Sequence, residues 1–166
     1  MSPATEPDLH PACLPLAFLL GSWRGEGIGG YPSIEGEDFR FVQELTFGHA
    51  GKPYLTHESR SWLLDEHGQP TRQAAAETGY WRAVGGDDVE VLLAHPTGFV
   101  EVWYGTVTGA RIELTTDAVV RTATAKEVTA GHRLYGMVDG DLAYAYDMAA
   151  EGLELQPHTS ARLRRA

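Results

Sequence analysis

Apolar residues recur at every second position through most of this chain, and this period constrains the fold more than any other feature. Successive side chains of a β-strand point to opposite faces, so a two-residue period is the pattern of a half-buried strand. The clearest runs lie at residues 39–47, 89–93, 100–104, 112–114 and 142–148. The sequence therefore predicts an all-β protein.

Short turn signals, rich in glycine, proline and aspartate, separate these runs. They lie at residues 48–51, 65–68, 85–88, 96–98, 108–110 and 139–141. Connections this short join antiparallel hairpins, because a parallel crossover needs a dozen or more residues. We count about ten strands between residues 22 and 164, and a sheet of that many strands in one small domain tends to close on itself. The predicted architecture is an antiparallel up-and-down β-barrel.

The N-terminal segment departs from this pattern. Residues 1–11 carry three prolines and few apolar groups, so we expect a flexible arm there and a single domain over 12–166. Asp8 and His10 are each suited to cap a short helix that has Pro11 in its first turn and runs to about Leu20.

Composition excludes several classes of function. The chain has 13 basic and 23 acidic side chains, a net charge of −10, which argues against binding to nucleic acid or to an anionic membrane surface. No apolar stretch is long enough to span a bilayer as a helix. The apolar residues 13–20 lack the basic flank of a signal peptide, so a cytoplasmic protein is expected. The single Cys13, expected in the core, excludes an internal disulfide.

A glycine-rich segment opens the first expected strand. Gly25, Gly27 and Gly30 satisfy the spacing of a dinucleotide-binding loop, but a helix precedes them and Pro32 follows, so the strand and helix that such a loop joins are missing. We interpret the segment as a bent strand whose glycines allow close backbone approach, with Trp23 closing the base of the barrel.

Five groups of residues along the chain also match a known family. They are the motif Gly21-x-Trp23-x-Gly25-x-Gly27 and residues 30–34, 95–101, 124–128 and 155–163. They follow one another in order over almost the whole domain. On these motifs the sequence resembles the nitrobindin family of haem-binding β-barrels.

The resemblance implies a ten-stranded barrel similar to fatty-acid-binding proteins and lipocalins, with a short N-terminal helix. It implies one haem b per chain, ligated axially by His158, and a ferric haem that isomerises peroxynitrite to nitrate and binds nitric oxide. Peroxynitrite and nitric oxide are the expected partners, no separate catalytic side chain is expected, and a homodimer is compatible with the sequence. Ser33 stands where the family often has threonine near the haem, and Lys126 matches a lysine associated with haem contact.

The residues alone leave the role of His158 open. The seven histidines are residues 10, 49, 57, 67, 95, 132 and 158. Strict alternation puts Thr159, Ala161 and Leu163 on one face of the last strand and His158 on the other. Either Pro157 introduces a bulge that changes the parity, or the ligand face is the partly polar one.

Two alternative functions remain. A carrier of a fatty acid or another apolar ligand would need a basic residue inside the barrel, for which Arg133 and Arg162 are candidates. A nitric oxide sensor would hold haem without turnover. By itself, without the motif, Lys126 is better interpreted as a solvated strand residue paired with Glu127. Trp23, Tyr31, Phe41, Leu55 and Met148 either line the pocket or pack in the core.

Overall fold

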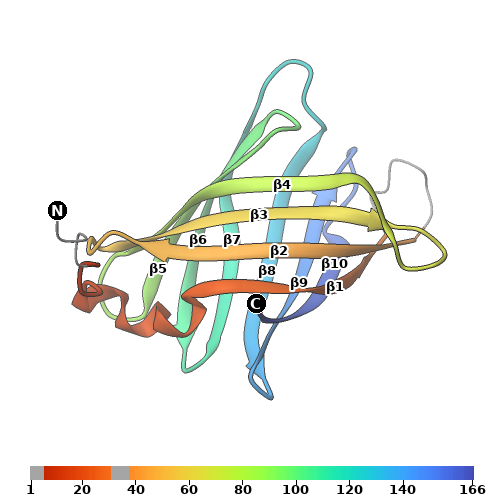
Figure 1. Cartoon of the computed structure of the whole chain (residues 1–166). Helices are drawn as coiled ribbons and strands as arrows, with labels where there is room; N and C mark the ends of the chain where they lie inside the picture. The colour runs from red at the N-terminus through yellow and green to blue at the C-terminus, as the bar shows by residue number, and fades with distance from the viewer. Residues whose placement is uncertain (1–5, 31–37) are drawn as a thin grey trace, which may run out of the picture.

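The computed structural model describes residues 6–30 and 38–166. Ten antiparallel strands in this part of the chain form one closed barrel (Figure 1). They are β1 (Gly21–Gly29), β2 (Phe39–His49), β3 (Tyr54–Leu64), β4 (Pro70–Ala83), β5 (Asp88–His95), β6 (Phe99–Thr108), β7 (Arg111–Arg121), β8 (Val128–Val138), β9 (Asp141–Ala150) and β10 (Gln156–Arg165). Each strand pairs with its neighbours in sequence, and β1 pairs with β10. The predicted up-and-down barrel is confirmed.

The predicted helix is the 3₁₀ helix η1 (Pro11–Leu19), which lies against one end of the barrel (Figure 1). His10 caps it, since its Nδ1 accepts from the backbone N–H of Ala12 at 3.1 Å. Cys13, Leu16 and Leu19 of this helix are buried. Burial raises the pKa of the Cys13 thiol, which fits the expected role of that side chain in the core.

Trp23 closes the barrel beside this helix, as expected. Its indole N–H donates to the carbonyl of Leu19 at 2.8 Å, and the guanidinium of Arg165 lies 4.2 Å from the centre of its ring. Phe47, Leu142 and Leu163 are also buried at this end. We call the region formed by Leu19, Trp23, Phe47, Leu142 and Leu163 the closed end.

The glycines of β1 allow the neighbouring strands to come close. A Cβ on Gly25 would lie 2.2 Å from the carbonyl oxygen of Arg162, and one on Gly27 would lie 2.4 Å from the ring of Phe41. Any larger side chain would therefore displace β10 or a residue of β2. The segment is a strand with a packing role, as the sequence indicated.

Alternation predicts each strand but does not always identify its inner face. In β2 the apolar residues Phe41, Leu45 and Phe47 are buried, as a barrel core requires. In β6, however, Val100 and Tyr104 are each 48% exposed, while the buried residues are Phe99, Glu101 and Trp103. Glu101 thus lies inside the barrel. The alternation of the valines in β6 does not reveal this, because they point outward.

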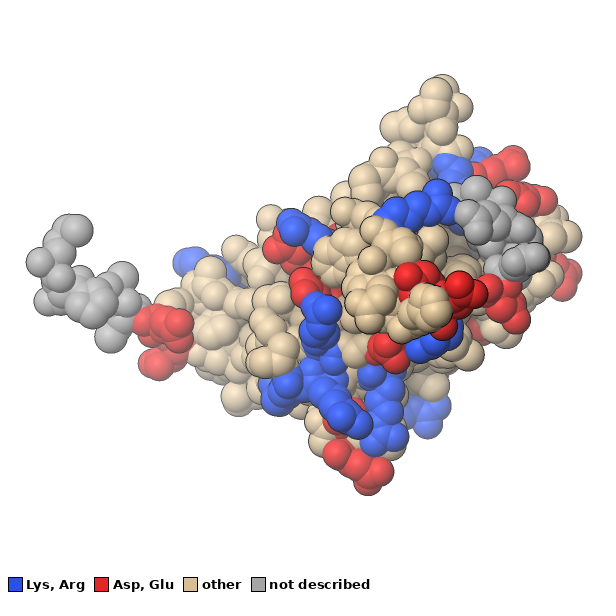
Figure 2. Space-filling model, turned by 45° about the vertical axis from the view of Figure 1, so that its right-hand side comes forward, with Lys and Arg blue, Asp and Glu red and all other residues tan. Residues whose placement is uncertain are grey.

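The surface carries mixed charge. Figure 2 shows basic side chains gathered in the middle of one face, with acidic side chains beside them. Ion pairs across strands account for part of this mixture, for example Arg24 with Glu44, and Arg162 with Asp141 at 2.7 Å. In the described part of the chain, no helix has the length and apolar character needed to cross a membrane.

Candidate functional site

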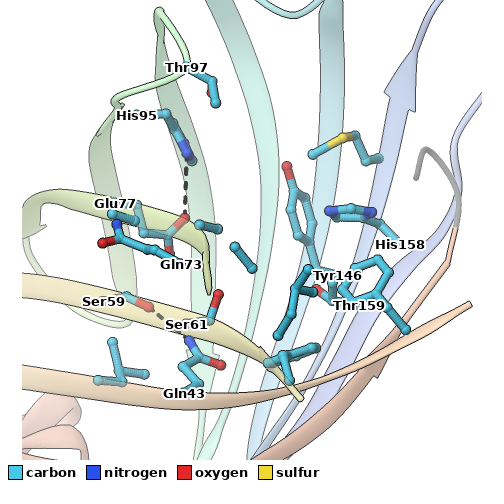
Figure 3. Close-up of a pocket in the computed structure, with 18 of the residues that line it drawn as sticks. Gln43, Ser59, Ser61, Gln73, Glu77, His95, Thr97, Tyr146, His158 and Thr159 are labelled. Atoms are coloured by element: carbon cyan, nitrogen blue, oxygen red, sulfur yellow. Dashed lines mark hydrogen bonds and ion pairs between the residues drawn. The ribbon is translucent and has the colours of Figure 1, made fainter. Parts of the chain in front are cut away.

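A cavity of about 410 Å³ opens at the end of the barrel opposite η1. We call this region the open end. Figure 3 shows a polar wall that carries Gln43, Ser59, Ser61, Glu77 and His95, and a facing wall formed by Tyr146, His158 and Thr159. Phe41, Met148 and Lys126 also line the cavity. Its volume is in the range of small-molecule sites.

A β-bulge in β10 brings His158 to this cavity. Pro157 pairs with Asp147 and Thr159 pairs with Tyr146, so His158 is one extra residue opposite two consecutive partners. Both His158 and Thr159 consequently line the cavity, although strict alternation would separate them. Of the two explanations that the sequence left open, the bulge is correct.

The imidazole of His158 is held against an aromatic neighbour. The ring of Tyr146 meets it edge to face, with centroids 5.4 Å apart and planes at 82°. Tyr146 is itself buried, and burial raises the pKa of its phenol. This wall of the cavity is therefore aromatic and neutral around one imidazole.

The other residues singled out from the sequence divide between the two ends. Lys126 lines the cavity, and burial lowers the pKa of its ammonium group, against an opposing effect of Glu151. Trp23 belongs to the closed end, and Leu55 is completely buried and does not line the cavity. Tyr31 and Ser33 lie outside the described residues.

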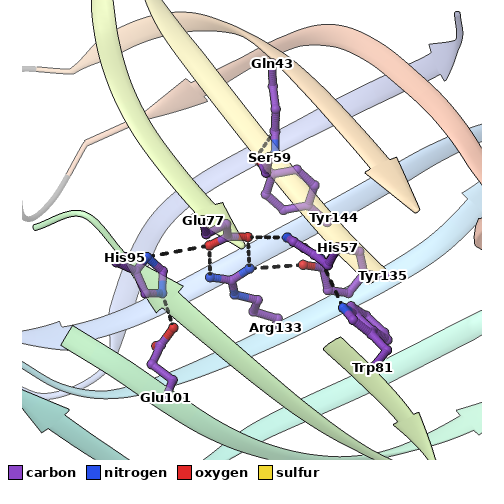
Figure 4. A network of polar contacts seen from close by, with 10 residues as sticks. All are labelled: Gln43, His57, Ser59, Glu77, Trp81, His95, Glu101, Arg133, Tyr135 and Tyr144. Carbon is purple, nitrogen blue, oxygen red and sulfur yellow. Dashed lines mark hydrogen bonds and ion pairs between the residues drawn. The ribbon is translucent and has the colours of Figure 1, made fainter. Parts of the chain in front are cut away.

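A buried ion pair forms the floor of the cavity (Figure 4). Arg133 donates through Nη1 and Nη2 to the two carboxylate oxygens of Glu77, at 2.7 and 2.8 Å. Burial alone would raise the pKa of the Glu77 carboxyl, but Arg133 and a hydrogen bond from His57 hold this pKa well below its usual value. Burial likewise works to lower the pKa of Arg133, yet the Glu77 carboxylate keeps it well above its usual value. Both groups are charged.

His57 supports Glu77 from the side of the closed end. The indole N–H of Trp81 donates to Nδ1 of His57 at 3.0 Å. An indole nitrogen can only donate, so Nδ1 is an acceptor and the hydrogen of the ring is on Nε2. This Nε2–H donates to Glu77 Oε1 at 2.9 Å.

A second buried pair lies on the polar wall. His95 Nε2 is in close contact with Glu101 Oε1, and the side chain of Glu101 is completely buried. His95 Nδ1 lies 3.8 Å from Glu77 Oε2. Figure 4 shows His95 between the two carboxylates.

The two arginines considered for a carrier lie on opposite sides of the barrel wall. Arg133 is inside, as expected, but Glu77 takes both of its terminal nitrogens, and its guanidinium lies 4.2 Å from the ring centre of Tyr146. The expectation of Arg162 inside the barrel is wrong. It is 51% exposed and pairs with Asp141, because its position alternates outward from Ala161 and Leu163.

Comparison with known proteins identifies the family. Residues 12–165 match the model of the "THAP4-like, heme-binding beta-barrel domain". The chain belongs to this family of haem-binding barrels. It is 56% identical over 158 residues to a protein of Nocardioides sp. named peroxynitrite isomerase, with 95% of each chain covered. It is 50% identical to the ferric nitrobindin-like protein of Kineococcus radiotolerans, again with 95% of each chain covered.

A solved structure agrees with the haem-binding barrel fold. The crystal structure of Rv2717c from M. tuberculosis superimposes with a TM-score of 0.85 at 40% sequence identity. The match covers 96% of this chain and 99% of that one.

The cavity of this haem-binding barrel suits a macrocycle better than a bare metal ion. Within residues 6–30 and 38–166, no three His, Cys, Asp or Glu side chains form a group that could hold an ion. A haem iron needs only an axial ligand from the protein, since its porphyrin supplies four nitrogens. Two histidines, His95 and His158, line the cavity, and His95 Nε2 is already bound to the carboxylate of Glu101. The donor set of the cavity therefore fits haem, which needs no more than one imidazole from the protein.

The polar network was not identified from the sequence. Glu77, His57 and Glu101 were not candidates, because Glu77 and Arg133 are 56 positions apart and meet only when the barrel closes. One signal was available for Glu101. It alternates with Phe99 and Trp103, a pattern that marks an inner face.

Proposed function

We propose that this protein is a peroxynitrite isomerase that binds one haem b per chain in the open end, with His158 as the axial ligand of the iron. The domain that does so would span residues 12–166. The observation that carries the proposal is the bulge in β10, which places the imidazole of His158 at the cavity. The chain belongs to a family of haem-binding barrels. The activity is inferred from relatives named peroxynitrite isomerase at 56% and 54% identity.

Each part of the cavity has a role in holding the group. His158 supplies the nitrogen ligand, and Tyr146 restricts rotation of its ring through the edge-to-face contact. Phe41 and Met148 supply apolar surface for the macrocycle. Lys126 lines the same cavity with a cation that suits a propionate, which would make its half-buried position favourable. Ser33 is proposed as a further contact on the basis of its motif alone.

The chemistry needs little from acid–base side chains. When bound, ferric haem supplies a Lewis-acidic iron with one open coordination position. Isomerisation of peroxynitrite to nitrate neither adds nor removes a proton. The chain would therefore have to hold the imidazole in place, and the aromatic and apolar side chains of the cavity would restrict the space around it.

The same geometry argues against a fatty-acid carrier. A carrier of this kind would use an internal cation for the ligand carboxylate, and Arg133 is the buried arginine of the cavity, whereas Arg72 in the same lining is exposed. Its terminal nitrogens already bind Glu77 in a bidentate pair. A fatty acid would have to displace a buried carboxylate that is fixed by three hydrogen bonds.

The decisive experiment combines haem titration with peroxynitrite decay. We expect the wild-type chain to take up one equivalent of haem and show a Soret band, and the ferric protein to accelerate peroxynitrite loss in stopped flow with nitrate as product. His158→Ala should abolish stoichiometric uptake, and added imidazole should restore it by filling the space. His132→Ala is the matched control, since His132 pairs with Glu113 on the exterior.

The outcomes separate the functions. A colourless protein that takes up no haem would refute the proposal and favour a carrier. A Soret band without acceleration of peroxynitrite decay would indicate a sensor of nitric oxide. Unchanged haem uptake by His158→Ala would refute the assignment of the ligand alone.

A further inference from the structure

The motif at residues 95–101 forms part of the cavity wall, yet the proposed haem site does not use it. In the β5–β6 hairpin His95 pairs with Phe99, and the two rings stack with centroids 4.0 Å apart. Gly98 in the turn has a φ of +104°, and a Cβ there would lie 2.6 Å from Thr122 Oγ1. The hairpin therefore fixes His95 at the cavity and Glu101 behind it.

Charge balance decides how many protons the His95–Glu101 pair holds. Glu77 and Arg133 neutralise each other. Glu101 is completely buried, and its Oε2 has no hydrogen-bond partner among the described residues. A carboxylate in such surroundings needs a compensating charge or a proton of its own. A pair that is neutral as a whole, either carboxylate with imidazolium or carboxylic acid with imidazole, meets this need.

Both neutral forms put a hydrogen on Nδ1 of His95. In the imidazolium, both ring nitrogens carry hydrogen. In the other form the carboxylic acid donates to Nε2, so the single hydrogen of the ring is on Nδ1. His57 cannot take this proton instead, because its Nδ1 accepts from Trp81.

Among residues 6–30 and 38–166, this N–H has no acceptor within hydrogen-bond distance. Glu77 Oε2 lies 3.8 Å from it and already accepts from Arg133 Nη2. The other charged groups that line the cavity are Asp38, Arg72 and Lys126, and Arg133 lies behind Glu77. His95 thus lines the cavity with an Nδ1–H that makes no hydrogen bond to the described residues and lies 3.8 Å from Glu77 Oε2.

We propose that His95, positioned by Glu101, donates a hydrogen bond to an acceptor atom of a small anion held in the cavity. Figure 3 shows His95 and His158 on opposite sides of the cavity, so an anion held between a haem on His158 and the polar wall would face His95. This inference rests on the proposed haem site. On this proposal His95 binds anions such as peroxynitrite, nitrite or fluoride. Neutral diatomic ligands would gain no comparable hydrogen bond from it.

The proton on Nδ1 can be measured without haem. We expect nitrogen NMR of the histidine-labelled, haem-free protein to show a protonated Nδ1 for His95 at pH 7. The resonance would be identified by its loss in His95→Phe/Glu101→Leu. This double variant removes both partners, so no unpaired carboxylate is left in the core. An Nδ1 without hydrogen in the wild type would overturn the proposal.

The anion contact is measured with fluoride and nitric oxide as probes of the ferric haem protein. A hydrogen bond to a charged group is strong enough that its loss in the double variant should weaken fluoride binding about tenfold. Nitric oxide, which is neutral, should bind within about twofold of wild type. His132→Phe/Glu113→Leu makes the same substitutions in the exterior pair and should bind both ligands as the wild type does.

The results distinguish the two proposals. Equal fluoride affinity in wild type and double variant would refute the role of His95 while leaving the haem site intact. Loss of haem uptake in the wild type would refute the haem site, and the NMR measurement would still decide the state of His95. A protonated Nδ1 together with selective weakening of fluoride supports both.

Discussion

The two ends of this barrel are stabilised in different ways. The closed end is apolar: Leu19, Trp23, Phe47, Leu142 and Leu163 belong to one buried hydrophobic cluster, and the indole N–H of Trp23 has its acceptor. The open end has a buried floor of charges, with Glu77 and Arg133 paired below a cavity. Truncation at the closed end should therefore remove packing, whereas truncation at the open end should leave a charge without its partner.

The largest test of this comparison is Arg133→Met. It leaves the Glu77 carboxylate buried with only His57, and breaking a buried pair costs about 4 kcal/mol of unfolding free energy. The double variant Glu77→Leu/Arg133→Met removes both charges and should recover most of that loss. Denaturant unfolding at pH 7 measures all three proteins.

The same pair of single variants and double variant can be made at the closed end. Leu142 and Leu163 pair across β9 and β10, and both are completely buried. Each substitution to alanine should cost about 2–5 kcal/mol, and the double variant should lose at least as much as either single variant. If removing both charges at the open end gave no recovery, the two ends would not differ in the way described.

The same contrast explains what the sequence could predict. Alternation and turns are local, so they predicted ten strands, the helix beginning at Pro11 and the closing role of Trp23. The bulge at His158 was one of two alternatives, because a single extra residue changes parity without changing composition. The polar floor was missed because its members come from β3, β4 and β8 and meet only in the closed barrel.

Lowering the pH should reduce the unfolding free energy through the open end and not through the closed end, with a smaller effect than the substitutions above. The pKa of Glu77 is well below its usual value in the folded protein, so its contribution is complete above the unfolded-state value, about 4.3. It is lost as the pH falls from there toward the folded-state value. Across that window the wild type should lose up to about 1.4 kcal/mol per pH unit more than Glu77→Leu/Arg133→Met does.

The measurement is urea unfolding of both proteins between pH 6 and the onset of acid denaturation. Leu163→Ala serves as the control, because it weakens the closed end without changing a titrating group. Its curve should run parallel to that of the wild type. Parallel curves for wild type and the charge-free variant would show that Glu77 does not stabilise the fold through its charge.

The smallest expected effect concerns Lys126, at the cavity of the open end. Lys126→Met keeps the length of the side chain and removes the charge proposed to meet a haem propionate. A partly exposed pair of this kind contributes about 0.5–1 kcal/mol, so haem affinity should fall about two- to fivefold. The loss should shrink at high salt, because ions screen exposed charges.

The chain has only one other lysine, Lys52, which precedes β3 near the closed end, and Lys52→Met should leave haem affinity unchanged. Equal haem affinity in wild type and Lys126→Met at low salt would mean that the lysine of the 124–128 motif serves the fold, as a partner of Glu151, and not the haem.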